Sequence, residues 1–174
     1  MAFAPDNRRV IACLGDTRDT RVWIWDVENG RELRQLPILN QPSITSLAVS
    51  SDGRRALLGC LNAGLRLLDL ETGQELRPLP IEVRSVTAVA LSPGGRHALT
   101  GRGTTRIEGD RKIVENVALQ LWDVASGQEL HRFEGLTDAL TSVVISADGR
   151  LALAGSGDGL VRLWDLSRRI PVQR

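Results

Sequence analysis

Residues that could perform acid–base or metal chemistry are few in this chain, and they show no catalytic spacing. The two histidines, His97 and His131, stand apart from the cysteines and from any metal-ligand pattern. The glycine-rich run Gly155–Gly159 joins two expected strands and opens no helix, so it lacks the helix N-terminus that completes a phosphate-binding loop. We therefore predict no catalytic residue, no metal site and no cofactor, and we interpret the chain as a non-enzyme.

The carboxylates that recur do so in step with a repeat. Glu32, Glu75 and Glu129 each follow a glycine by two positions and precede a leucine. Residues that return at a fixed spacing in every unit indicate a structural role, because a single active site needs only one set of them. Acid–base chemistry by these groups is therefore not expected.

The repeat itself is defined by a closing dipeptide that ends in aspartate. The four copies are Trp25-Asp26, Leu68-Asp69, Trp122-Asp123 and Trp164-Asp165, and the steps between them are 43, 54 and 42 residues. A turn-forming triplet also recurs before the second strand of each unit, as Pro5–Asn7, Ser51–Gly53, Pro93–Gly95 and Ala147–Gly149. Between these markers lie short apolar runs such as 140–146 and 150–156, which predict strands.

A period of about 40–45 residues with four strands and a closing Trp-Asp resembles the WD-repeat signature, and the resemblance covers nearly the whole chain. It implies an all-β fold, a WD-repeat β-propeller with four four-stranded antiparallel blades. The blades are expected at about 1–39, 40–80, 81–135 and 136–174, within a single propeller region 1–174. Each blade is too thin to bury both of its faces, so neighbouring blades must cover one another.

The hydrogen-bond network that the resemblance implies is mostly missing. Unit three keeps a hydroxyl together with its tryptophan (Thr100, Trp122), and unit four keeps Asp158 with Trp164. We therefore expect apolar packing to hold the blades, since one buried hydrogen bond contributes only about 0.5–1.5 kcal/mol net.

Two features depart from the repeat and are candidates for partner binding. Unit one has Trp23 where the other units have Arg66, Gln120 and Arg162; either it packs on a neighbouring strand, or it serves an interface, where tryptophan is enriched. Unit three has an insertion at 103–117, which predicts a projecting hairpin that is either a partner-binding element or a solvated ornament. The candidate binding residues in it are Arg106, Glu108, Asp110, Arg111 and Lys112.

Composition indicates a soluble globular protein, and the resemblance to WD-repeat proteins implies that its partners are proteins or peptides. The 174 residues carry a net charge of only +1, which does not favour nucleic acid or an anionic membrane as a partner. No apolar run approaches the ~20 residues that cross a bilayer, and the first residues do not resemble a secretory signal. We expect a cytoplasmic protein.

Four blades account for the whole chain, whereas WD-repeat rings usually have about seven. The chain is then a piece of a longer propeller, half of an eight-bladed ring closed by a second copy, or a strained four-bladed ring. The leading functional prediction is a non-catalytic protein–protein interaction scaffold that displays loops from its blades. The alternative is a sensor or targeting segment of a larger multidomain enzyme, such as a bacterial kinase.

Overall fold

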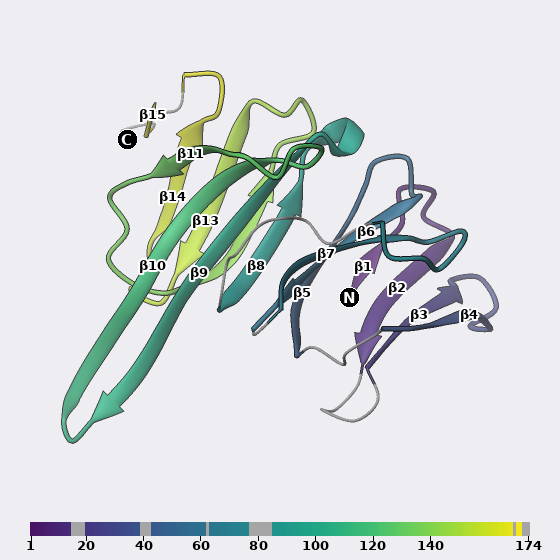
Figure 1. Ribbon diagram of the computed structural model, residues 1–174, viewed down its shortest axis with the longest axis horizontal. Helices are drawn as coiled ribbons and strands as arrows, with labels where there is room; N and C mark the ends of the chain where they lie inside the picture. The colour runs from purple at the N-terminus through teal and green to yellow at the C-terminus, as the bar shows by residue number, and fades with distance from the viewer. Residues whose placement is uncertain (15–19, 39–42, 62, 77–84, 169, 172–174) are drawn as a thin grey trace.

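The computed structural model describes all residues except 15–19, 39–42, 62, 77–84, 169 and 172–174. The described residues form four separate antiparallel sheets, which we call blades one to four (Figure 1). Blade one contains β1 (Ala2–Phe3), β2 (Arg9–Leu14), β3 (Arg21–Asp26) and β4 (Glu32–Pro37), and blade two contains β5 (Ile44–Val49), β6 (Arg55–Cys60) and β7 (Gly64–Asp69). Blade three contains β8 (Val86–Leu91), β9 (His97–Glu108), β10 (Arg111–Asp123) and β11 (Glu129–Phe133), and blade four contains β12 (Leu140–Ile145), β13 (Leu151–Ser156), β14 (Val161–Asp165) and β15 (Ile170–Pro171).

Blade two differs from the expected four strands. Its fourth strand, expected from Glu75, is present as a single bridge between Leu68 and Glu75, and the expected continuation lies outside the described residues. The other three blades have four strands each, so the all-β propeller architecture that the repeat predicts is confirmed.

The blades follow one another along an arc that does not close. The first strands lie side by side in chain order, β1 beside β5, β5 beside β8 and β8 beside β12. Blade one, with the N-terminus, lies at one end of the arc, and blade four lies at the other end (Figure 1). One side of each terminal blade therefore faces away from its neighbour in the chain.

Adjacent residues of a strand point to opposite sides of a blade, and this alternation builds one core on each side. Leu67 packs with blade three, whereas its neighbour Leu68 packs with blade one. We call the side that meets the next blade the following face and the other side the preceding face. Three apolar clusters fill the interfaces between successive blades, which explains why the central strands are apolar on both sides.

Tight turns connect the strands, and helical structure is minimal. The described residues contain one helical element, the 3-10 turn η1 (Pro93–Gly95), where Gly94 and Gly95 have φ of 77° and 69°. Such positive φ values favour glycine, because a side chain there meets its own backbone. Within the described part of the chain, no helix has the length and apolarity needed to span a membrane.

Candidate partner-binding surface

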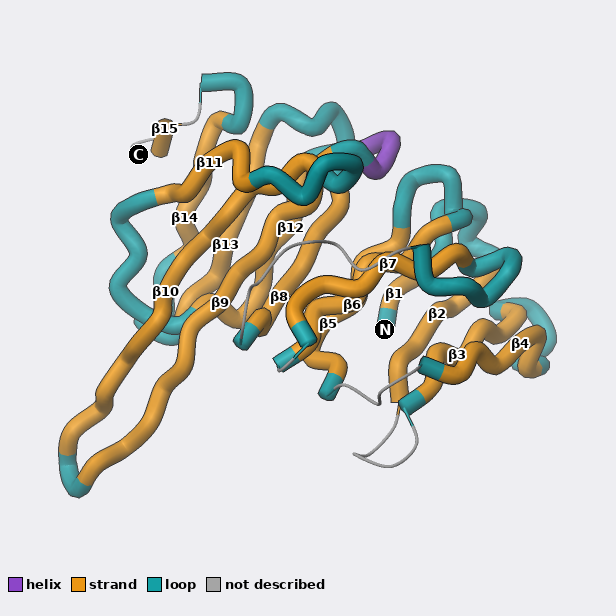
Figure 2. The backbone as a smooth tube through the Cα atoms, viewed as in Figure 1, coloured by secondary structure: helices purple, strands orange, loops and turns teal. Residues whose placement is uncertain are grey.

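The insertion in blade three is a two-stranded hairpin that continues β9 and β10 beyond the rest of the blade (Figure 2). Its strands pair from Thr104–Glu115 to Glu108–Arg111, and a register shift between Glu115 and Ala118 separates it from the blade. The tip turns over Gly109 and Asp110, and Gly109 has a φ of 59°. A glycine with positive φ at the first central position is a pattern of tight hairpin turns, so the sequence determines this turn locally.

Two contacts fix the hairpin against blade four, one at its base and one near its tip. Gly103 approaches Ala139 so closely that a Cβ on it would lie 2.5 Å from the Ala139 Cα. Lys112 forms an ion pair with Asp138, which is buried, and the hydrogen bond from Lys112 lowers the pKa of that carboxyl. Lys112, a predicted binding residue, is therefore engaged in holding the hairpin in place.

The outer part of the hairpin presents charges of both signs. Arg106 pairs with Glu108, and its other nitrogen lies 3.3 Å from Glu115. Asp110 and Arg111, at the tip, make no ion pair within the described chain, and the Ile107 side chain beside them is 77% exposed. The four remaining predicted residues thus lie on the outer part of the hairpin. Ile107, which the sequence analysis did not single out, points to the side opposite to Arg106 and Glu108, because adjacent residues of a strand alternate.

Trp23 lies far from this surface, at the other end of the arc. It stacks on Trp25 with ring centroids 6.2 Å apart and an interplanar angle of 4°, and both rings are half-buried on the preceding face of blade one. The structure therefore does not bring Trp23 together with the hairpin residues.

The aspartates that close each repeat cap the turn into the fourth strand. The Oδ1 atoms of Asp26, Asp69 and Asp165 each accept hydrogen bonds from the backbone N–H groups two and three residues further along, and Asp123 Oδ1 accepts one from the residue three positions on, at 2.7–3.2 Å. These bonds favour the ionised carboxylate, and they lower the pKa of Asp69 and Asp123, while the Ser167 hydroxyl is the main cause for Asp165. The repeated aspartates are therefore structural.

The large residue before each aspartate faces the preceding blade. Trp122 Nε1 donates to Thr100 Oγ1 at 2.9 Å, while Trp164 is buried against Phe133 with ring centroids 5.7 Å apart. Leu68 fills the same position in blade two.

Asp158 organises the turn between β13 and β14. It accepts hydrogen bonds from Thr137, Arg162 and the Leu160 backbone, and Ser156 also contacts it. These donors, led by Arg162, hold the pKa of Asp158 far below its ordinary range.

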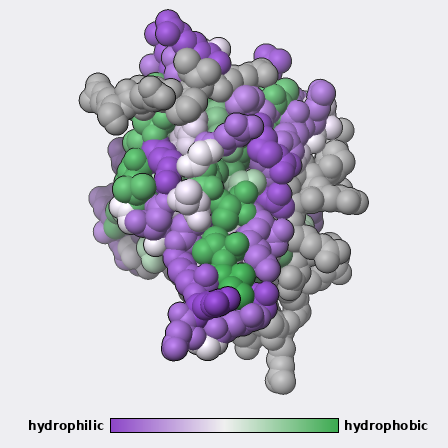
Figure 3. Space-filling view, turned by 90° about the vertical axis from the view of Figure 1, so that its left-hand side faces the viewer, coloured by the Kyte–Doolittle hydropathy of each residue, from purple (hydrophilic) through white to green (hydrophobic). Residues whose placement is uncertain are grey.

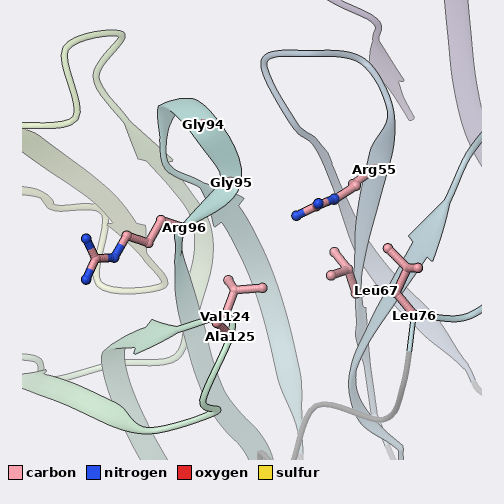
Figure 4. A pocket seen from close by; sticks show the side chains of 8 residues that line it. All are labelled: Arg55, Leu67, Leu76, Gly94, Gly95, Arg96, Val124 and Ala125. Carbon is pink, nitrogen blue, oxygen red and sulfur yellow. The ribbon is translucent and has the colours of Figure 1, made fainter.

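Sequence reasoning missed a pocket of about 320 Å³ between blades two and three, on the side away from the hairpin (Figure 4). Its apolar lining includes Leu67, Leu76 and Val124, and the Arg55 side chain points into it while Arg96 points away. The corresponding residues at the next interface, which include Leu121, Leu130 and Leu166, line a smaller pocket of about 160 Å³. This recurrence is a signal that an alignment of the repeats could have found. The pocket can hold an apolar side chain beside a carboxylate.

Nucleophiles and metal ligands do not gather in the described part of the chain. No group of three or more His, Cys, Asp or Glu residues there could hold a metal ion. Cys13 and Cys60 are free thiols, and burial raises their pKa to about 12 and about 11. Both thiols are therefore protonated at neutral pH and weakly nucleophilic.

This architecture, in which thin antiparallel blades cover one another around an arc, is that of a β-propeller. A family model described as "WD domain, G-beta repeat" matches residues 127–165. The solved structure of U3-55K superimposes with a TM-score of 0.74 at 21% identity, over 98% of this chain and 49% of that chain.

Two curated relatives carry the same repeats. Autophagy-related protein 16 of Arabidopsis thaliana is 29% identical over 151 residues, which are 86% of this chain and 28% of that protein. The WD repeat domain-containing protein 83 homolog of Dictyostelium discoideum is 30% identical over 137 residues, which are 75% of this chain and 37% of that protein. The chain belongs to the WD-repeat family, and it spans about a third of the length of these two relatives.

Proposed function

We propose that this chain is a non-catalytic protein–protein interaction scaffold, and that the β9–β10 hairpin binds an extended segment of its partner by strand addition. The observation that carries the proposal is the open edge on each side of the hairpin. β8 pairs with β9 no further than Val86–Arg102, and β11 pairs with β10 only as far as Leu119–Phe133. Along the described residues beyond these points, each hairpin strand has one edge without a neighbouring strand.

An unpaired strand edge presents a row of backbone donors and acceptors to which an extended peptide can add. The side chains of the hairpin then select the peptide. Ile107 offers an exposed apolar contact, and Arg106, Glu108, Asp110 and Arg111 offer charges of both signs. A partner segment that alternates apolar residues with charges of both signs fits this surface.

The contacts between the hairpin and blade four support this role. Because Lys112 binds Asp138 and Gly103 packs on Ala139, the hairpin has a defined direction before a partner arrives. Preorganisation of this kind reduces the entropy lost on binding.

A displayed library of random peptides tests the proposal. Peptides are selected on the intact chain and then measured against a variant in which a two-residue Asn-Gly turn replaces residues 104–115. We expect binding to the variant to fall at least tenfold, while far-UV circular dichroism and a single cooperative urea transition show that the blades stay folded. The urea midpoint itself should fall, because the variant lacks Lys112 and leaves the buried Asp138 without its ion pair. Bound peptide should also slow amide hydrogen exchange at 104–108 or 111–115. Peptides that bind both proteins equally, with no protection there, would show that the hairpin is an ornament.

We infer a cytoplasmic setting and a protein partner rather than nucleic acid. The two cysteines are free thiols, which is usual in a reducing compartment, and the net charge is only +1.

The second candidate function is a sensor or targeting segment of a larger multidomain enzyme. It is favoured by the short span of this chain, which covers 28% and 37% of its two relatives. Sequencing the transcript that encodes the chain tests it: an in-frame continuation with kinase motifs supports this role, and in-frame stop codons on both sides exclude it.

A further inference from the structure

The two ends of the arc carry the two halves of one interface that already joins the blades inside the chain. At each of the three internal interfaces, aliphatic residues of a following face meet a preceding face whose centre is Leu68, Trp122 or Trp164. Blade four ends the arc with a following face, and blade one begins it with a preceding face. Each end is therefore complementary to the other.

The following face of blade four has the right residues, but nothing in the described chain covers it. Val161, Leu65 and Leu119 each pair with a glycine of the neighbouring strand, so the three residues occupy equivalent positions in their blades. Leu65 and Leu119 are 2% and 0% exposed, whereas Val161 is 71% exposed. Leu153 and Val144 of the same face are 40% and 54% exposed. Figure 3, which views the molecule from the side of β11 and β14, shows hydrophobic residues at the surface among hydrophilic ones.

The preceding face of blade one is aromatic. Phe3 pairs with Val10, and Val10 pairs with Trp25, so the three side chains share that face with Trp23. Phe3 is 65% exposed, although Leu91, at the same position in blade three, packs against the core shared with blade two. The stacked Trp23 and Trp25 rings lie beside Phe3 on this face and are half-buried.

Shape also matches between the two ends. Gly59 and Gly101 leave a hollow on the following faces of blades two and three, and the methyl groups of Val89 and Val143 from the next blade occupy it. Gly155 leaves the same hollow on blade four, where the atoms nearest to an added Cβ belong to Thr141 and Ser142 of its own blade. Ala2 of blade one and Ala90 of blade three occupy equivalent positions in their sheets. Met1, which precedes Ala2, therefore corresponds to Val89, and its side chain is 93% exposed.

We propose that a second copy of this chain covers both faces at once, so that blade four of each copy packs on blade one of the other. Two such contacts close a ring of eight blades, within the range of 4–8 that propellers adopt. The contact continues the interface that the chain repeats three times internally, and it buries aliphatic residues against tryptophan in the same way. Contact between two like faces would leave the two remaining faces of the pair exposed to water.

Native mass measured by light scattering at micromolar concentration tests the proposal. The intact chain should run at about 38 kDa, twice the 19.0 kDa of one chain. Val161→Asp and Phe3→Asp should each give a monomer, because each variant spoils both contacts of the ring. Ile107→Asp, at an equally exposed apolar position outside the end faces, is the matched control and should keep the dimer.

Mixing the two end variants identifies the geometry. The Val161→Asp protein keeps an intact blade one, and the Phe3→Asp protein keeps an intact blade four, so an equimolar mixture should recover a dimer through one good contact. A monomeric intact chain overturns the proposal. So does a dimer that survives either substitution, since that result means that like faces pair or that another surface is used.

Discussion

Blades three and four share one sheet architecture and one buried tryptophan, but they satisfy that tryptophan differently. Trp122 donates its indole N–H to Thr100, while Trp164 has a buried Nε1 with no acceptor in the described structure, because Ala154 stands at the position of Thr100. Trp164 is nevertheless almost completely buried. The comparison teaches that packing against the preceding blade is sufficient to place the tryptophan, and that the hydrogen bond adds to stability without deciding the fold.

The two blades also differ in the turn between their second and third strands. Blade four holds a short turn with Asp158 at its centre, whereas blade three extends the same strands into the hairpin. One connection therefore stabilises its blade, and the other projects beyond its blade.

The largest effect is expected from removing the unpaired tryptophan. Trp164→Ala should lower the free energy of unfolding by about 3–5 kcal/mol, because it leaves a cavity against Phe133 between blades three and four. Urea unfolding followed by circular dichroism measures the loss. Leu33→Ala, at an exposed position of blade one, is the control and should change stability by less than about 0.5 kcal/mol. Equal losses in the two variants would mean that packing does not hold blade four.

Removing a hydroxyl group from blade three and adding one to blade four should change stability by an intermediate amount. Thr100→Val should destabilise the protein by about 1–3 kcal/mol, since Trp122 Nε1 stays buried without its acceptor. Ala154→Ser should stabilise it by about 0.5–1.5 kcal/mol by giving Trp164 the acceptor that it lacks.

The control for this exchange is Ala152→Ser, two residues earlier on the same face. Its counterpart in blade three is Ala98, which does not bond the indole, so the new hydroxyl should be buried at a net cost. If Ala152→Ser stabilised the protein as much as Ala154→Ser, a general effect of serine would replace the hydrogen-bond explanation.

The smallest effect is a difference in acid sensitivity that comes from Asp158. Its pKa is lowered in the folded protein, so its hydrogen bonds stabilise blade four fully above the unfolded value near 4 and are progressively lost at lower pH. The urea midpoint of the intact chain should therefore fall between pH 6 and pH 3 by more than that of Asp158→Asn. Asp110→Asn, at the hairpin tip, should fall like the intact chain, and a decline that is the same in all three proteins would contradict the assignment.

Much of the fold could be predicted from the repeat, because local chemistry specifies it. The turn triplets, the Asp caps and the alternating apolar strands each depend on residues close in sequence. The fourth strand of blade two is the exception. It was expected from Glu75, but within the described residues only the Leu68–Glu75 bridge is present, and the rest of it lies outside them.

The candidate surface was only partly accessible from the sequence. The insertion was evident from the 54-residue step, but the sequence does not show which of its charged residues form ion pairs. Lys112 pairs with Asp138, 26 residues away, and no local pattern indicates that contact. The pocket beside Arg55 was missed for a similar reason, because residues of two blades form it.

The sequence by itself determined the blade, since a strand of period two and a glycine or aspartate turn are local properties of the chain. Tertiary structure decided which faces are covered. Leu65 and Val161 occupy the same position of the repeat, yet one is buried and the other is exposed, because only the first has a blade beside it. A side chain is buried only where two surfaces meet, and a single repeat supplies only one of the two.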